Sequence, residues 1–128
     1  MVTNTKHFSI STDPMIQCPC CKQGRLSIPT LIVLEDVREH FRQPVTILSG
    51  ARCEQHNIDV DGSEYSQHIF DPLTYIANAA DITVRDTDPR DVHRFLANVP
   101  YANLLGVGRY KTFTHVDPRG FRARWYNA

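Results

Sequence analysis

Residues 79–84 read AADITV, a short apolar run that contains one carboxylate. Its β-branched residues and two-residue alternation predict a strand, with Asp81 and Thr83 on one face and Ile82 and Val84 on the other. A carboxylate in the middle of such a strand costs free energy unless it is paired, hydrogen-bonded or bound to a cation. Asp81 therefore marks both the centre of the predicted sheet and a candidate site.

Toward the amino terminus, the sequence predicts a helix, a strand and a long loop. Residues 29–41 carry apolar side chains at three- and four-residue steps, which is typical of a helix with one buried face. This stripe comprises Leu31, Leu34, Val37 and Phe41. Residues 45–50, VTILSG, predict a strand that ends at Gly50. Residues 51–68 are polar and turn-rich, and long loops of this kind in compact domains are usually functional or mobile.

Toward the carboxyl terminus, residues 88–99 predict a second helix, because Asp88 suits the N-cap and Pro89 the first turn. Three short strands then follow as an antiparallel meander, over residues 103–110, 112–117 and 122–127. The elements together predict a small α+β single domain with an antiparallel sheet and two main helices. It spans residues 1–128, with an irregular amino-terminal lead over residues 1–28.

The composition is that of an ordinary globular protein, with 41% apolar and 22% charged residues. The 14 basic residues balance the 14 acidic ones, so no overall field attracts nucleic acid or anionic lipid. No apolar run is long enough to cross a membrane, and the amino terminus lacks the apolar centre of a signal peptide. We expect a monomer that is made in the cytoplasm without a signal peptide.

The chain has 4 cysteines, of which Cys18, Cys20 and Cys21 are clustered and Cys53 lies far away in sequence. A structural zinc site usually shows two C-x2-C pairs or a mixture of cysteine and histidine, and CPCC does not have that form. Buried thiols, or one disulfide from Cys53 to the cluster, are the favoured interpretation over a zinc knuckle.

Two histidines complete a candidate metal site with Asp81. His68 follows the polar loop, and His115 lies in TFTHVD, on the same strand face as Asp117. Two histidines and one carboxylate leave one position open on a tetrahedral zinc ion, which is the pattern of a catalytic site. Asp71 is a competing ligand in a turn-like setting. Surface positions are predicted for His7, His40 and His93, and His56 is left open.

Five fragments appear in a fixed order, VTILSGARC, HN, DGSEYSQH, AADI and FTHVD followed by RW. Together they resemble the zinc D-Ala-D-Ala carboxypeptidase and endopeptidase family, whose fold is shared with the hedgehog amino-terminal domain. The resemblance covers about residues 30–125. It implies that His68, Asp81 and His115 bind one zinc ion per chain, and that Arg52 lies beside the substrate carbonyl or carboxylate. Ser66 matches the serine of the family's S-x-H motif and is a candidate substrate contact.

The sequence departs from the family pattern in three places. His68 and Asp81 stand thirteen residues apart, farther than is usual in the family, and Asn78 lies near the position of the family's glycine. The extra residues, 69–77, are expected to bulge outward and form part of the cleft wall. Phe70, Leu73 and Tyr75 would then help to select the substrate.

The third departure concerns the general base, which relatives place shortly before the last ligand. Phe113 and Thr112 occupy those places and cannot take a proton from the attacking water. Asp117 is the leading candidate for the base, and Glu64 is a distant second. Asp117 could alternatively orient a ligand histidine through its free ring nitrogen.

The resemblance implies a zinc metallopeptidase that hydrolyses a D-amino-acid-containing bond in peptidoglycan stem peptides. Its setting would be cell-wall degradation by a phage or prophage endolysin, or wall remodelling, with action at the wall or in the periplasm after phage-mediated release. A non-catalytic zinc-binding structural or binding module, such as a phage tail or assembly protein, is the alternative. An α+β domain without a metal is a third possibility.

Overall fold

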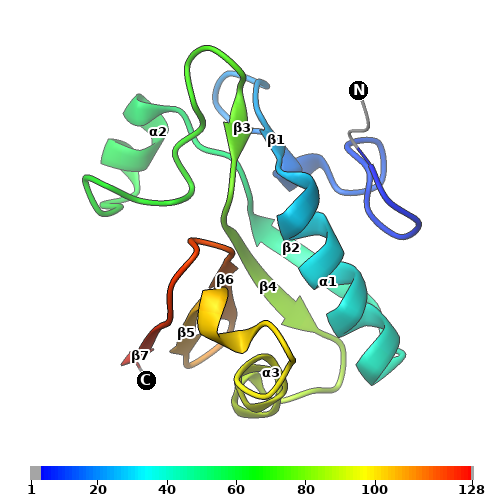
Figure 1. The fold of residues 1–128 in the computed structure, drawn as a ribbon. Coiled ribbons are helices and arrows are strands. Elements are labelled where there is room, and N and C mark those ends of the chain that lie inside the picture. Colours follow the sequence, from blue (N-terminus) through cyan, green and yellow to red (C-terminus); the bar gives the residue numbers. More distant parts are fainter. Residues whose placement is uncertain (1–3, 128) are drawn as a thin grey trace.

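The computed structural model describes residues 4–127, and its largest element is a five-stranded sheet (Figure 1). The strands are β2 (Val45–Ser49), β4 (Ala80–Val84), β5 (Gly106–Tyr110), β6 (Thr114–Asp117) and β7 (Ala123–Asn127). They lie in the order β2-β4-β6-β5-β7, and every neighbouring pair is antiparallel except β5 and β7. The predicted α+β single domain is confirmed, although residues 1–3 and 128 of that prediction lie outside the described part.

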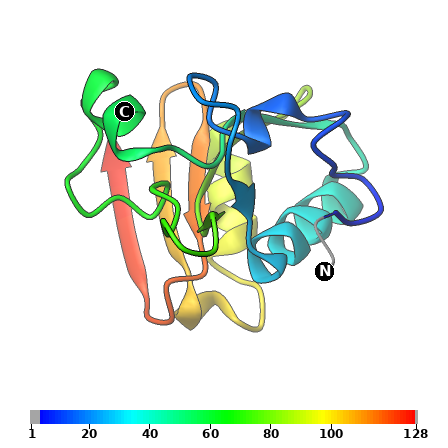
Figure 2. The same cartoon turned by 90° about the horizontal axis from the view of Figure 1, so that it is seen from above.

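The last strand corrects the predicted meander. β7 does not pair with β6 but lies on the far side of β5 and runs parallel to it. Alternation of side chains shows which face of a strand is buried, but it does not show which strand is the neighbour. Figure 2 shows β7 at one edge of the sheet, with the amino-terminal segment and α1 toward the opposite side.

Helices α1 (Ile28–Phe41) and α3 (Pro89–Leu96) are the two main helices predicted. Each begins at a capping side chain. Ser27 Oγ accepts a hydrogen bond from the Thr30 amide, and Asp88 Oδ1 accepts one from the Arg90 amide. α1 ends at Arg42, whose φ of 55° is left-handed, and α3 ends three residues before the predicted boundary at 99.

The predicted loop over residues 51–68 contains a third, short helix, α2 (Glu54–Asp59). Cys53 caps it, because its sulfur accepts a hydrogen bond from the His56 amide at 3.3 Å. The helix has one buried residue, Asn57, and therefore shows no apolar stripe in the sequence. Two single-turn 3-10 helices complete the helical elements, η1 (Pro14–Ile16) and η2 (Ala102–Leu104).

The register of the central strands separates a packed face from a functional face. Asp81 pairs directly with His115, whereas the next pair along the strands, Ile82 and Thr114, points to the other face. Thr114 Oγ1 donates to the Pro89 carbonyl at the start of α3, so α3 covers the face opposite to Asp81. The sheet therefore presents Asp81 and His115 on the side that α3 leaves uncovered.

The amino-terminal segment is anchored rather than irregular throughout. Strand β1 (Arg25–Leu26) pairs in parallel with β3 (Ile76–Ala77), forming a separate two-stranded sheet. The segment also contributes Phe8, Ile16 and Cys18 to the core. The prediction of an irregular lead missed these contacts, because two-residue strands leave no periodic pattern.

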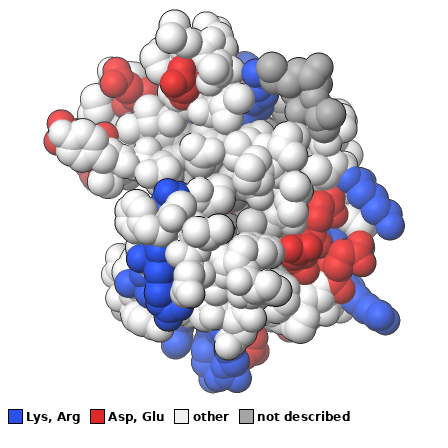
Figure 3. All heavy atoms as spheres, viewed as in Figure 1, with Lys and Arg blue, Asp and Glu red and all other residues white. Residues whose placement is uncertain are grey.

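The surface carries no dominant charge on the face shown in Figure 3, where basic and acidic side chains form small separate groups. His93, predicted at the surface, is 6% exposed and packs against the Tyr126 ring at 4.9 Å. That prediction was wrong, because β7 covers this side of α3. Within residues 4–127, no helix has the length and apolar character needed to cross a membrane.

Candidate metal centre

Strands β4 and β6 bring two of the candidate ligands together. Asp81 and His115 are direct cross-strand partners, and His115 Nδ1 lies 3.0 Å from Asp81 Oδ1. Neighbouring antiparallel residues on one face are the closest pairs that a sheet offers. This register therefore places a carboxylate and an imidazole side by side.

His68 reaches the same point from the loop before β3. The Arg52 amide donates to the His68 carbonyl at 2.7 Å, and Ser66 Oγ accepts from the His68 amide at 3.1 Å. These bonds fix the backbone, and His68 Nε2 then lies 3.1 Å from Asp81 Oδ1. The predicted ligands His68, Asp81 and His115 thus converge, although thirteen residues separate the first two.

The outer nitrogens of both rings fix their tautomers. His68 Nδ1 lies 2.7 Å from the Gly50 carbonyl, which can only accept, so this nitrogen carries the proton. His115 Nε2 donates in the same way to Asp117 Oδ2 at 2.6 Å. Both inner nitrogens are then free to offer a lone pair toward Asp81 Oδ1. Two lone pairs and a carboxylate oxygen repel one another unless a cation lies between them.

The donor set suits zinc. The nitrogens of His68 and His115 and an oxygen of Asp81 lie within 4.8 Å of one another, and all three residues are buried. Zinc binds histidine nitrogen and carboxylate oxygen at about 2.0–2.2 Å, and three protein ligands leave a fourth position for substrate or water. Hydrogen bonds that the outer nitrogens donate, here to the Gly50 carbonyl and to Asp117, orient the histidine ligands of zinc sites.

The electrostatics of the centre favour a cation. Burial raises the pKa of Asp81, but the neighbouring His115 and His68 rings outweigh it and hold that pKa far below its usual range. Burial lowers the pKa of His115, whereas Asp117 and Asp81 raise it, and the net shift is upward. A carboxylate is therefore kept ionised at a point where positive charge is stabilised.

Asp117 lies behind His115, away from the cavity. Its side chain has no exposed surface and both oxygens are occupied. Oδ2 accepts from His115 Nε2 and from an Arg119 Nη at 2.8 Å, and Oδ1 accepts from Arg119 Nε at 2.8 Å. This geometry favours the orienting role over the predicted role of general base. Arg119, which no sequence motif indicated, holds the carboxylate in place.

A cavity of about 650 Å³ opens over the three ligands. Its wall includes Arg52, Ser66, Tyr110, Phe113, Arg119 and Trp125. Arg52 is fixed by three contacts, from Nε to Ser49 Oγ, from one Nη to Asn57 Oδ1 and from the other Nη to Asp81 Oδ2 at 3.4 Å. The predicted contacts Arg52 and Ser66 thus lie beside the centre, with a guanidinium next to the ligand carboxylate.

Three wall or support residues escaped sequence reasoning. Trp125 Nε1 donates to the Tyr110 hydroxyl at 3.0 Å, and the His115 and Trp125 rings lie 5.1 Å apart. Asn57 accepts from Arg52 and donates to the Ser63 carbonyl at 2.9 Å, which ties the loop to α2. The HN and RW fragments contained Asn57 and Trp125, but the contacts of these residues depend on tertiary structure.

The extra residues 69–77 do not form the cleft wall. Tyr75 is absent from the residues that line the cavity, and its carbonyl accepts from the Arg25 amide beside β1. Phe70 packs under Gly24, where an added Cβ would lie 2.9 Å from the Phe70 ring. The geometry therefore gives no support to the predicted substrate contact of Tyr75.

The remaining acidic candidates are also accounted for. Asp71 Oδ1 accepts from the Leu73 and Thr74 amides at 2.7 and 3.2 Å, so it stabilises a turn. Glu64 lines a separate hollow beside α2. Neither side chain is part of the centre formed by His68, Asp81 and His115.

Comparison with known proteins gives one match. The family model described as Peptidase M15 matches residues 7–117, which include all three ligands and Asp117. Searches of curated proteins and of solved structures find no match.

Proposed function

The chain belongs to the peptidase M15 family, and on that premise we propose that it hydrolyses a D-amino-acid-containing peptide bond in peptidoglycan stem peptides. The observation that carries this proposal is the convergence of two histidine lone pairs and one carboxylate on a single point at the floor of a cavity. That arrangement supports one catalytic zinc ion, held by His68 Nε2, Asp81 and His115 Nδ1. Zinc in such a site supplies Lewis-acid activation of water and of the scissile carbonyl.

Arg52 is the residue that we propose to bind the substrate. Its guanidinium lines the cavity and is held by Ser49, Asn57 and Asp81, so little side-chain entropy is lost on binding. A charge-assisted hydrogen bond from this group suits either the carbonyl oxygen or the terminal carboxylate of a stem peptide. Trp125 and Tyr110 supply a flat aromatic wall, and Ser66 a hydroxyl, at the same opening.

The proton acceptor must be a group other than Asp117 if that carboxylate stays buried. The carboxylates among the described residues that line the cavity are Asp61 and Asp81. Asp81 is engaged as a ligand, whereas Asp61 is exposed and sits on the loop after α2 with a left-handed φ of 56°. We therefore propose Asp61 as the proton acceptor, to be tested with an Asp61→Asn variant.

A non-catalytic zinc-binding module is the second candidate function, and one observation favours it. Phe113, which cannot transfer a proton, lines the cavity near His115. A module of this kind would keep the zinc site and bind wall fragments without cleaving them.

As the setting of the enzyme, we propose lysis or remodelling of the cell wall in a phage or prophage context.

Digestion of purified peptidoglycan, followed by mass spectrometry of the fragments, tests the proposal. New amine ends should form with the unmodified protein and be absent with a His68→Ala, His115→Ala double variant. Release of terminal D-alanine would identify a carboxypeptidase, and cleavage inside the stem or cross-link an endopeptidase. Intact peptidoglycan after incubation with zinc-loaded protein would contradict the enzyme and leave the module.

A further inference from the structure

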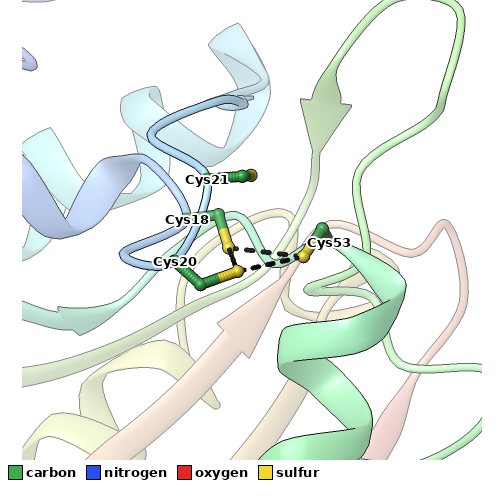
Figure 4. Close-up of side chains that lie close together, drawn as sticks. All are labelled: Cys18, Cys20, Cys21 and Cys53. Carbon is green, nitrogen blue, oxygen red and sulfur yellow. Dashed lines mark hydrogen bonds between the residues drawn. The ribbon is translucent and has the colours of Figure 1, made fainter.

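Four cysteine sulfurs meet where the amino-terminal segment touches the start of α2 (Figure 4). The Sγ atoms of Cys18, Cys20 and Cys53 form a triangle with sides of 3.4, 3.7 and 3.3 Å. The Cys21 Sγ lies within 4.8 Å of the other three. All four are free thiols, so of the two interpretations that the sequence favoured, buried thiols or one disulfide from Cys53, the disulfide is not present in this structure.

These separations are slightly shorter than those of sulfurs around a single metal ion and far longer than a disulfide bond. A disulfide bond joins two sulfurs at about 2.05 Å and does not place a third sulfur at an equal distance from both. Tetrahedral zinc–thiolate bonds of about 2.3 Å place neighbouring sulfurs about 3.8 Å apart. We propose that Cys18, Cys20, Cys21 and Cys53 bind a structural zinc ion, separate from the centre at His68, Asp81 and His115.

The chain turn around Cys18 is shaped for such a site. The Cys18 amide donates to the Gln23 carbonyl, and the Lys22 amide donates to the Cys18 carbonyl, both at 2.8 Å. The turn needs left-handed backbone at Lys22 and Gly24, with φ of 59° and 99°. It folds Cys18, Cys20 and Cys21 back toward one point, although CPCC lacks the usual C-x2-C spacing.

The four sulfurs lie within 4.8 Å of one another, so four thiolates at this place would repel one another without a cation. A bound dication removes that repulsion, because metal coordination deprotonates thiols outright.

The composition of the cluster favours zinc over other occupants. Four thiolates without a carboxylate or histidine select soft or borderline ions in tetrahedral geometry. Iron–sulfur clusters hold their cysteines around several atoms, which requires wider sulfur separations than this cluster shows.

The position of the site gives it a mechanical role. Cys53 directly follows Arg52, and the Gly50 carbonyl orients His68. A metal at the four cysteines would link the amino-terminal turn to this short segment, and no cysteine lines the cavity. The inference does not depend on peptidase activity, since a binding module would need the same brace.

Metal analysis of three proteins tests the inference. Purified protein should contain about two zinc ions per chain, and a Cys20→Ser, Cys21→Ser variant and a His68→Ala, His115→Ala variant about one each. Both substituted cysteines are exposed, so the change leaves the core intact. The second variant is the matched control, because it removes only the other site.

Cobalt substitution supplies a readout that does not depend on the folding of the cysteine variant. Co²⁺ in the His68→Ala, His115→Ala protein should give the near-ultraviolet sulfur-to-cobalt charge-transfer bands of thiolate ligation. Absence of these bands would overturn the proposal, as would iron in place of zinc. A disulfide among these cysteines, found by mass spectrometry in protein purified anaerobically and alkylated without any chelator, would also overturn it.

Discussion

Replacement of Asp117 by asparagine separates an orienting role from a role as general base. The amide can accept one hydrogen bond from His115, but its NH₂ group then faces the donors of Arg119. Removal of one carboxylate that orients a zinc-bound histidine typically lowers metal affinity about 10–100-fold. That loss corresponds to about 1.4–2.7 kcal/mol, which agrees with the value of a hydrogen bond to a charged group.

The metal-free protein should also lose stability. Breaking a buried ion pair costs about 3–5 kcal/mol, and we expect the lower end, because the Arg119 side chain is 21% exposed and keeps part of its hydration. Urea unfolding in the presence of a chelator measures this term, and competition with a chromophoric chelator measures zinc affinity. Asp91→Asn is the matched control, since Asp91 forms only an exposed pair with Arg90.

Activity at saturating zinc decides between the two roles. If Asp117 orients His115, the Asp117→Asn protein should recover most of its cleavage rate once the site is filled. Unchanged zinc affinity together with a complete loss of cleavage at saturating zinc would refute the reasoning. Asp117 would then have to leave its buried position and act as the base.

Three further predictions concern the scaffold. Ser27→Ala removes the cap of α1 and should lower the free energy of unfolding by about 1 kcal/mol, measured in urea, with little effect on zinc binding; an unchanged midpoint would show that the cap is dispensable. Gly108→Ala would place a Cβ 2.3 Å from the Trp125 indole nitrogen, so the indole ring must move. We expect a shift of the tryptophan emission maximum and weaker substrate binding. An unshifted emission spectrum would contradict the contact. Burial, together with Arg124 and Arg109, lowers the pKa of His93, so the folded state holds this ring neutral. The contribution of the neutral ring to the free energy of unfolding is present above the ordinary pKa of histidine and is lost as the pH falls below it. His93→Phe should therefore reduce the loss of stability between about pH 7 and 5. An unaltered slope of stability against pH would exclude His93 as the source of that loss.

The sequence predicted the central strands well because their patterns are local. AADITV and TFTHVD each alternate, and Asp88, the N-cap of α3, stands next to Pro89 at the start of that helix. Contacts between distant segments were harder to predict. The proximity of Asp81 and His115 came from the resemblance of ordered motifs, because alternation alone does not pair strands.

The role of Asp117 and the path of residues 69–77 could not be read from the sequence for the same reason. Arg119 donates hydrogen bonds to the Asp117 carboxylate and holds it in its buried position. The position of Arg119 depends on the turn after β6. The extra residues bind the amino-terminal segment through pairing of β1 with β3, an interaction between two-residue strands that carry no periodic signal. Helix α2 was missed because its one buried residue is a polar asparagine.

Gly50 has a consequence for how far this chain can be shortened. Its amide donates to the Met15 carbonyl at 2.9 Å, while its own carbonyl accepts a hydrogen bond from His68 Nδ1. Gly50 thus joins the amino-terminal turn to a metal ligand through its own amide and carbonyl. A Cβ at this position would lie 2.8 Å from the Met15 carbonyl oxygen. A truncated form that begins at α1 would retain His68, Asp81 and His115 and most of the sheet, yet lose the support that orients His68. The smallest functional unit therefore includes the residues around Met15, which lie outside every motif that suggested the metal site.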